Sequence, residues 1–336
     1  MFRTFTLVSM LGLALCAWPS EANDSTAELA ASGLVLTRDD DIEMRSEDLF
    51  ISMEEVVVKY RFLNTAAADK TVRVAFPMPD VEYSESDIGI PTDDPQNLLG
   101  FRTLVDGAAV GAEVEQRAWK GETDVTGLLR QLGVPLQPHL QATWDALDAL
   151  PAGVKATLVQ GGLAGVNEYD AGRGWERHLV PAWRLTTTYH WEQTFPAGRE
   201  ISIEHRYRPA VGGTAGTSVG SPFSEADPDY RAYLDRFCVE GPFLSAVNRR
   251  MRQQRVEYPP YTERRIAYVL KTGANWKKPI GSFRLVVDKG SPDNLVSFCA
   301  NGVRKISPTR FEVTHENWLP ENDLDILILE PVPTAE

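Results

Sequence analysis

The segment from Gly216 to Gly220 has the Gly-x-Ser-x-Gly spacing that positions the nucleophile of many serine hydrolases. That chemistry requires a sharp turn between a buried strand and a helix, because the serine must project from the turn. Gly-Gly-Thr-Ala precedes the pattern, and Pro222 follows it. Since neither flank suits a buried strand or a helix, we interpret residues 212–221 as a flexible linker.

Five histidines could supply a metal site or a general base: His139, His178, His190, His205 and His315. None has the His-x-x-x-His or His-Glu-x-x-His spacing that places two ligands on one helix face. His190 and His205 would face each other across a hairpin with a two-residue loop. In that register the apolar residues of one strand would lie on the opposite side of the hairpin from those of the other strand. We therefore expect His205 to be a packed residue beside Tyr189.

Asp39, Asp41 and Glu43 lie in an acidic run, and carboxylate oxygens are the ligands that calcium prefers. The run lacks the glycine and the regular alternation of an EF-hand loop. A solvated strand edge is the alternative interpretation. These three residues are the calcium candidates of the chain, and we expect no other cofactor.

Tyr169, Trp175 and Trp183 flank a glycine-rich loop. Aromatic side chains on loops suit carbohydrate or peptide recognition, because they give rigid contact area with a polar edge. They serve equally well to seal a sheet beneath a helical segment. We predict these three residues as candidate ligand contacts.

The chain is acidic, with 34 Lys and Arg against 47 Asp and Glu and a net charge of −13. Phosphate backbones and anionic lipid surfaces repel such a chain, which argues against a nucleic-acid partner. The paired carboxylates of a glycosidase cannot be selected among so many acidic residues without distances. An envelope hydrolase that acts on glycan or peptide through acidic residues therefore remains the alternative to a binding protein.

Residues 1–22 have the three-part layout of a cleavable secretory signal. Arg3 supplies the positive charge, an apolar run extends from Phe5 to Trp18, and a small residue, Ala22, precedes the cut. The apolar run is shorter than the roughly 20 residues that a membrane span needs. We therefore expect export from the cytoplasm, with no membrane insertion after cleavage.

Cleavage would remove Cys16 and leave Cys238 and Cys299 as an even pair. An even pair in an exported protein is a disulfide candidate. The bond would constrain the unfolded chain by roughly 4 kcal/mol. We predict a structural disulfide between Cys238 and Cys299.

Apolar residues alternate with period two in many segments, which is typical of half-buried strands. Short connections predict antiparallel hairpins, one from residues 52–64 to 71–76 and another across residues 182–209. A three-residue loop, Pro196-Ala197-Gly198, would place Trp191 opposite Ile203 and Tyr189 opposite His205. The tail returns to strands over residues 265–271, 282–288, 294–300, 309–315 and 324–329.

Helical spacing is confined to two regions. Residues 124–165 read as a helical insertion, with helices ending near Leu132, Leu150 and Leu163. Two further helices are expected over 227–237 and 243–254.

The predicted fold is mainly β, with one or more antiparallel β-sandwiches, a helical insertion and two further helices. The expected domains are a signal peptide (residues 1–22), a sandwich domain (23–211), a linker (212–225) and a C-terminal α+β part (226–336). The C-terminal part could pack into the same body as the sandwich domain.

Several longer motifs resemble a bacterial family of exported proteins labelled domain of unknown function 4424. They are residues 76–80 (FPMPD), 191–198 (WEQTFPAG), 205–209 (HRYRP), 270–276 (LKTGANW), 283–289 (FRLVVDK) and 292–299 (PDNLVSFC). The resemblance implies an exported protein of undetermined activity, with no catalytic residues to carry over. Members of that family are typical of Gram-negative bacteria, so the resemblance also implies a periplasmic location.

Residues 52–118 are also similar to the N-terminal domain of inter-alpha-trypsin inhibitors, through the order of an alternating strand, residues 74–79 (VAFPMP) and an Asp106-Gly107 turn. That similarity implies a β-sandwich used in extracellular assemblies.

The function predicted from these observations is that of a non-catalytic periplasmic protein that binds an envelope protein, a small ligand or a glycan. A deep polar pocket with two carboxylates about 5–9 Å apart would favour hydrolysis instead. A shallow aromatic groove would favour binding, and a large exposed apolar patch would favour a structural subunit.

Overall fold

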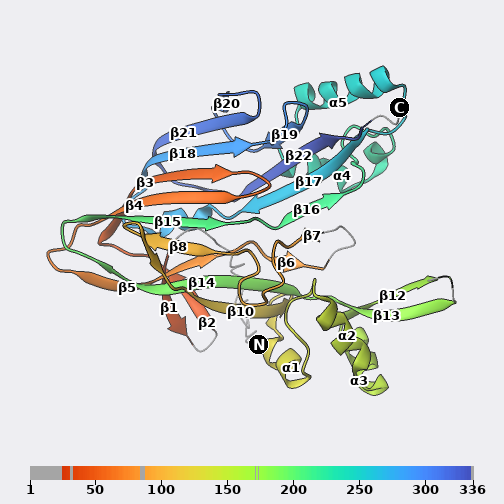
Figure 1. Cartoon of the computed structure of the whole chain (residues 1–336), viewed down its shortest axis with the longest axis horizontal. Coiled ribbons are helices and arrows are strands. Elements are labelled where there is room, and N and C mark those ends of the chain that lie inside the picture. Colours follow the sequence, from red (N-terminus) through yellow and green to blue (C-terminus); the bar gives the residue numbers. More distant parts are fainter. Residues whose placement is uncertain (1–24, 31–32, 84–87, 171, 173, 334–336) are drawn as a thin grey trace, which may run out of the picture.

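The computed structural model describes residues 25–30, 33–83, 88–170, 172 and 174–333. It is mainly β, as predicted, with three larger sheets, one two-stranded ribbon and five α-helices among these residues (Figure 1). The predicted signal peptide, residues 1–22, lies outside the described residues. No helix in the described part of the chain is both long and apolar enough to cross a membrane.

Sheet A contains long central strands and short edges. Its strands are, in spatial order, β11 (Thr123–Asp124), β10 (Glu113–Lys120), β14 (Arg184–Phe195), β5 (Lys70–Pro77), β1 (Ser25–Ala30) and β2 (Gly33–Thr37), with β6 (Val81–Glu82) paired to β14.

Sheet B packs against sheet A. Its strands are β20 (Arg304–Lys305), β21 (Arg310–Trp318), β18 (Ile280–Asp288), β3 (Ile42–Ile51), β4 (Val56–Asn64), β15 (Glu200–Tyr207), β8 (Arg102–Val105) and β9 (Ala108–Val110). The β18–β3 pair is parallel, and the other pairs of this sheet are antiparallel.

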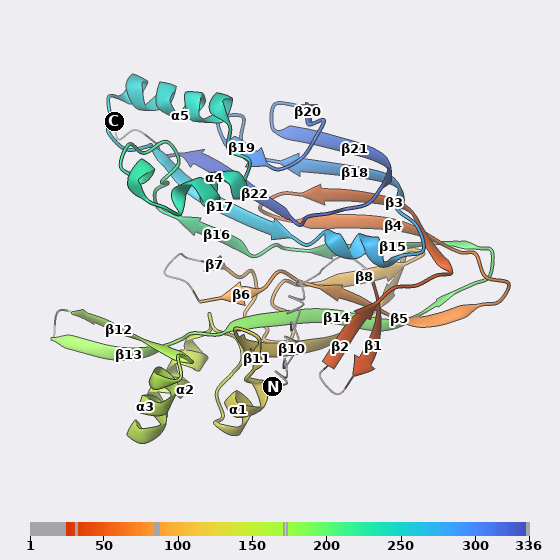
Figure 2. The same ribbon diagram turned by 180° about the vertical axis from the view of Figure 1, so that it is seen from behind.

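Sheet C and a two-stranded ribbon complete the β structure. Sheet C contains β19 (Leu295–Phe298), β22 (Leu324–Pro331), β17 (Tyr261–Tyr268), β16 (Val211–Thr214) and β7 (Ile88–Gly89), and the ribbon contains β12 (Ala164–Asp170) and β13 (Trp175–Pro181). The ribbon projects away from the body in both views (Figures 1 and 2).

The helices lie on the outer faces of the sheets (Figure 1). The predicted insertion forms α1 (Thr126–Gln131), α2 (Gln141–Ala149) and α3 (Ala152–Gln160) below sheet A, while α4 (Tyr230–Arg236) and α5 (Gly241–Gln254) cover sheet C. Short 3₁₀ turns occur at Ser224–Ala226 and Lys271–Asn275. All five predicted helices are therefore present.

The two predicted hairpins are wrong. Strands β4 and β5 lie in different sheets, as do β14 and β15, so each tight connection is a corner between layers and not a hairpin turn. The predicted cross-strand pairs of Trp191 with Ile203 and of Tyr189 with His205 are therefore absent from the described strands. Trp191 instead lies against His205 across the sandwich, with ring centroids 5.3 Å apart. Alternating apolar residues indicate only that one face of each strand is buried. They are equally compatible with a following strand in the same sheet and with a following strand in the sheet that faces it.

The core lies between sheets A and B. Rings from both layers interlock, for example Phe62 of β4 with Phe195 of β14 at 5.8 Å and Phe76 of β5 with His205 of β15 at 4.8 Å. A second, smaller cluster joins α4 and α5 to sheet C through Phe237 and other buried residues. Burial of aromatic side chains on this scale is a dominant stabilising contribution.

Sheets B and C each contain strands from the predicted sandwich domain, residues 23–211, and from the predicted C-terminal part, residues 226–336. The C-terminal residues 226–336 thus pack into the same body as the earlier strands. The expected linker, residues 212–225, begins inside β16, and Val219 within it is buried in the second cluster.

Candidate functional site

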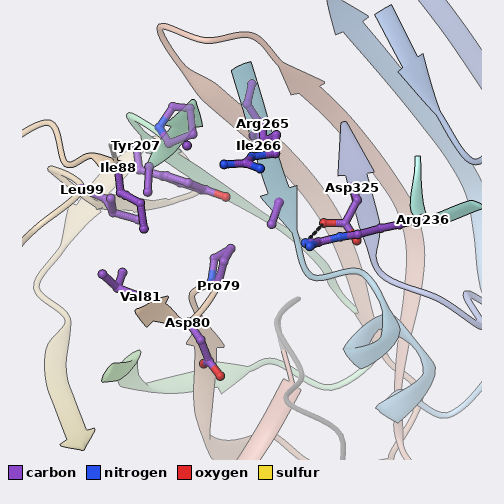
Figure 3. Close-up of a pocket in the computed structure, with 14 residues that line it drawn as sticks. Pro79, Asp80, Val81, Ile88, Leu99, Tyr207, Arg236, Arg265, Ile266 and Asp325 are labelled. Atoms are coloured by element: carbon purple, nitrogen blue, oxygen red, sulfur yellow. Dashed lines mark hydrogen bonds and ion pairs between the residues drawn. The ribbon is translucent and has the colours of Figure 1, made fainter. Parts of the chain in front are cut away.

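A cavity of about 180 Å³ lies where strands of sheets A, B and C come together (Figure 3). Engineered cavities of roughly 150 Å³ hold a molecule the size of benzene, so this space suits a small ligand. One wall is apolar and consists of the buried side chains of Val81, Leu99 and Ile266. The charged residues of the lining are Asp80, Arg236, Arg265 and Asp325.

Arg236 and Asp325 form the first charged pair of the cavity. Arg236 ends α4 and Asp325 lies in β22, and Arg236 Nη2 is 2.7 Å from Asp325 Oδ1. The hydrogen bond to Asp325 raises the pKa of Arg236. Figure 3 shows the guanidinium and the carboxylate together at the rim of the cavity.

Arg265 supplies a second guanidinium from β17. Its Nη1 lies 3.3 Å from Oε1 of Glu263, a residue that is only 2% exposed. Glu263 also accepts hydrogen bonds from the hydroxyls of Thr217, at 2.7 Å, and Tyr233. Burial is the main reason that the pKa of Tyr233 is raised. A buried carboxylate therefore holds Arg265 in place from behind.

Tyr207, near the end of β15, lines the cavity with 5% of its surface exposed. Burial raises the pKa of its hydroxyl. The hydroxyl can donate a hydrogen bond to an acceptor of a ligand in the cavity.

Asp80 closes the other side of the cavity (Figure 3). It accepts a hydrogen bond from Arg184 Nη1 at 2.6 Å. Asp80 and Pro79 end the FPMPD motif, and Tyr207 belongs to the HRYRP motif. Two of the motifs that carry the family resemblance therefore meet at this cavity, although they are far apart in the sequence.

Sequence reasoning did not identify these residues as a site. Arg236 ends a helix while Arg265 and Asp325 lie in strands, and only the packing of these elements brings the three together. The available signal was Asp80, a charged residue at the end of the FPMPD motif.

The predicted disulfide is present, with Cys238 Sγ 2.10 Å from Cys299 Sγ. It joins the segment between α4 and α5 to the end of β19. The bond lies at a separate groove and does not line the cavity.

The three candidate aromatic residues do not form one cluster. Trp175 is 78% exposed near the tip of the β12–β13 ribbon, and Tyr169 is exposed on the opposite strand. Trp183 is buried, and its indole N–H donates to the Leu136 carbonyl at 2.8 Å. The burial of Trp183 matches the alternative role of sealing the sheet beneath the helices, and a ligand role for the exposed pair remains a prediction.

The calcium candidates have cationic partners. Lys70 Nζ lies 2.9 Å from Asp39 and 2.7 Å from Asp41, while Lys278 Nζ lies 2.7 Å from Glu43. These contacts lower the pKa values of Asp41 and Glu43. Asp39 and Glu43 are buried beside a central sheet, so the expectation of a solvated strand edge is wrong for them.

The histidines do not gather into a metal centre in the described ranges, where no group of three His, Cys, Asp or Glu could hold an ion. His205 is buried as predicted, and its Nδ1 lies 3.0 Å from Thr103 Oγ1. Ser218 is exposed in a turn after β16, and no helix follows it directly.

Comparison with known families gives one match of nearly full length. A model described as domain of unknown function DUF4424 matches residues 22–327. The chain belongs to this family. The similarity of residues 52–118 to the inter-alpha-trypsin-inhibitor domain is not borne out. No curated protein matches the chain.

A solved structure from Legionella pneumophila is similar in outline. It is described as a "putative nutrient binding protein" and has 16% sequence identity, with 92% of this chain and 70% of that chain covered and a TM-score of 0.44. Likeness at this level carries no argument about the site.

Proposed function

We propose that this DUF4424 protein is an exported, non-catalytic binding protein that holds a small carboxylate-bearing ligand in the central cavity. The observation that carries the proposal is that two guanidinium groups and one tyrosine side chain line the same ligand-sized space. The groups are those of Arg236, Arg265 and Tyr207.

The chemistry of these groups selects a carboxylate. Guanidinium offers several N–H donors in a planar fork that matches a carboxylate, and such charge-assisted bonds are the stronger ones. The Tyr207 hydroxyl would donate a further hydrogen bond. Asp80 and Asp325 add acceptors on the same cavity, and these suit an ammonium group. A small zwitterion such as an amino acid fits both sets, with its aliphatic part against the apolar wall.

Export is part of the proposal. Residues 1–22 carry the secretory layout, and disulfides persist in oxidising compartments such as the periplasm. Mass spectrometry of the protein from a periplasmic fraction would test this, with a mature N-terminus at Asn23 as the expected result.

Calorimetric titration of the mature protein with amino acids and with the corresponding amines, which lack the carboxylate, tests the ligand class. Binding of the amino acids alone is expected. Tyr207→Phe removes only the hydroxyl, and Arg265→Gln removes the charge. Each should weaken binding about tenfold, equivalent to about 1.4 kcal/mol. Arg199→Gln is the matched control, since Arg199 pairs with Asp106 away from the cavity.

Equal binding of the amines, or unchanged affinity in both cavity variants, would refute the carboxylate assignment. Turnover of glycan or peptide substrates by the wild type, lost on substitution of Asp80 or Asp325, would show a hydrolase instead.

A further inference from the structure

A second hollow of about 690 Å³ lies between sheets B and C, beside the disulfide, and shares no lining residue with the central cavity. Its volume is within the range of ordinary ligand sites, about 300–1,000 Å³. We refer to it as the disulfide groove, because Cys238 and Cys299 form part of its wall.

The floor of the disulfide groove is aromatic. Phe283 of β18 and His315 of β21 are direct cross-strand partners. The Trp318 ring lies 4.3 Å from the Phe283 ring and 5.1 Å from the His315 ring, measured between centroids. Leu319, at the rim, is 48% exposed. The groove therefore offers apolar contact area and an aromatic surface that attracts cations.

The charges of the groove have one sign. Glu240, Glu321 and Asp323 line it, and its lining contains no lysine or arginine. Asp323 accepts hydrogen bonds from the backbone N–H groups of Leu270 and Lys271, and its Oδ2 lies 3.8 Å from Lys271 Nζ. Glu240 and Glu321 are exposed, and neither has an ion-pair partner among the described residues. Two carboxylates are thus free to pair with a bound cation.

The disulfide positions one of these carboxylates. Glu240 lies two residues after Cys238, immediately before α5. The bond fixes that segment against the end of β19.

We propose that the disulfide groove binds a short basic segment of a partner protein. An apolar side chain of the segment rests on the Phe283–Trp318 floor, and flanking lysine or arginine side chains pair with Glu240 and Glu321. Charge complementarity selects this partner, because the carboxylates of Glu240 and Glu321, which have no ion-pair partner among the described residues, repel an acidic segment. The arginine or lysine head groups also gain from the Trp318 face.

Fluorescence anisotropy with a labelled peptide Lys-Leu-Leu-Leu-Lys tests the proposal on the mature protein. We expect saturable binding that weakens with added salt. The paired substitutions Glu240→Gln and Glu321→Gln should weaken it at least tenfold, as should Trp318→Ala. Glu316→Gln is the matched control, since Glu316 is an exposed acid on β21 outside the groove. A Trp318→Phe variant is expected to retain most of the affinity. That result would show that the effect of Trp318→Ala comes from loss of the aromatic ring and not from misfolding.

Three outcomes would overturn the proposal. They are the absence of binding, equal binding of Glu-Leu-Leu-Leu-Glu, and binding of hexylamine as tight as that of the peptide, which would indicate a small organic cation. Arg265→Gln, which tests the central cavity, should leave peptide affinity unchanged, so failure of one site is distinguishable from failure of the other.

Discussion

His178 of β13 connects the projecting ribbon to the helical insertion through a pair of carboxylates. Its Nδ1 lies 2.7 Å from Asp148 Oδ2 at the end of α2, and its Nε2 lies 3.3 Å from Glu176 Oε2. Asp148 also accepts the backbone N–H of Leu179 at 2.9 Å. The hydrogen bonds to the two carboxylates raise the pKa of His178, while that of Asp148 is lowered.

The contact between α2 and β13 should therefore weaken as the pH rises above neutrality. A raised His178 pKa gives stabilisation that is complete below the ordinary value of 6.5 and is lost as the pH rises through the folded-state value. A lowered Asp148 pKa gives stabilisation that is present above 3.8 and is lost in acid. Hydrogen exchange at the Leu179 amide, corrected for intrinsic rates, should show less protection at pH 9 than at pH 6.

His178→Asn should abolish that difference between the two pH values. A wild-type Leu179 amide that is protected equally at both would contradict the role of the protonated imidazole. Lys155, which donates to the Asp148 carbonyl at 2.8 Å, should hold α3 in place throughout.

At the scale of elements, alternation predicted the strands well but not their sheets. Residues 182–209 do form two strands with the predicted buried faces. The sequence pattern contains no information on whether a strand that follows a tight turn stays in its sheet or crosses to the opposite one. The central cavity was unpredictable for the same reason, because Arg236, Arg265 and Asp325 converge only through that layering. The helical insertion was predictable because its spacing and its proline stops are local.

Gly281 of β18 lies against the backbone of β3. A Cβ at this residue would lie 2.5 Å from the Arg45 carbonyl oxygen, next to the register shift between Met44 and Ser46. Gly281→Ala should lower the free energy of unfolding by about 1–3 kcal/mol, because backbone must move to admit the methyl group. Urea unfolding of the variant measures the change.

Gly111→Ala is the control for that experiment, since a Cβ there meets nothing within 4 Å. Equal effects of the two substitutions would show that the parallel strand pair is more adaptable than its spacing indicates.

At the scale of the whole molecule, the disulfide links the helices over sheet C to the body. The bond closes a sequence separation of 61 residues. Replacing both cysteines, Cys238→Ala with Cys299→Ala, should reduce the free energy of unfolding by about 4 kcal/mol in the chain-entropy model. Denaturant unfolding of the oxidised wild type and the double variant provides the measurement, and an unchanged midpoint would contradict a structural role.

The parallel pairing of β3 with β18 has a consequence for the order in which the protein matures. Register partners such as Ser46 and Ser282 are separated by most of the polypeptide. A chain that is synthesised from its N-terminus cannot join these two strands until most of it has been made. Until then β3 can pair only with its other neighbour, β4, so sheet B is completed last along this edge.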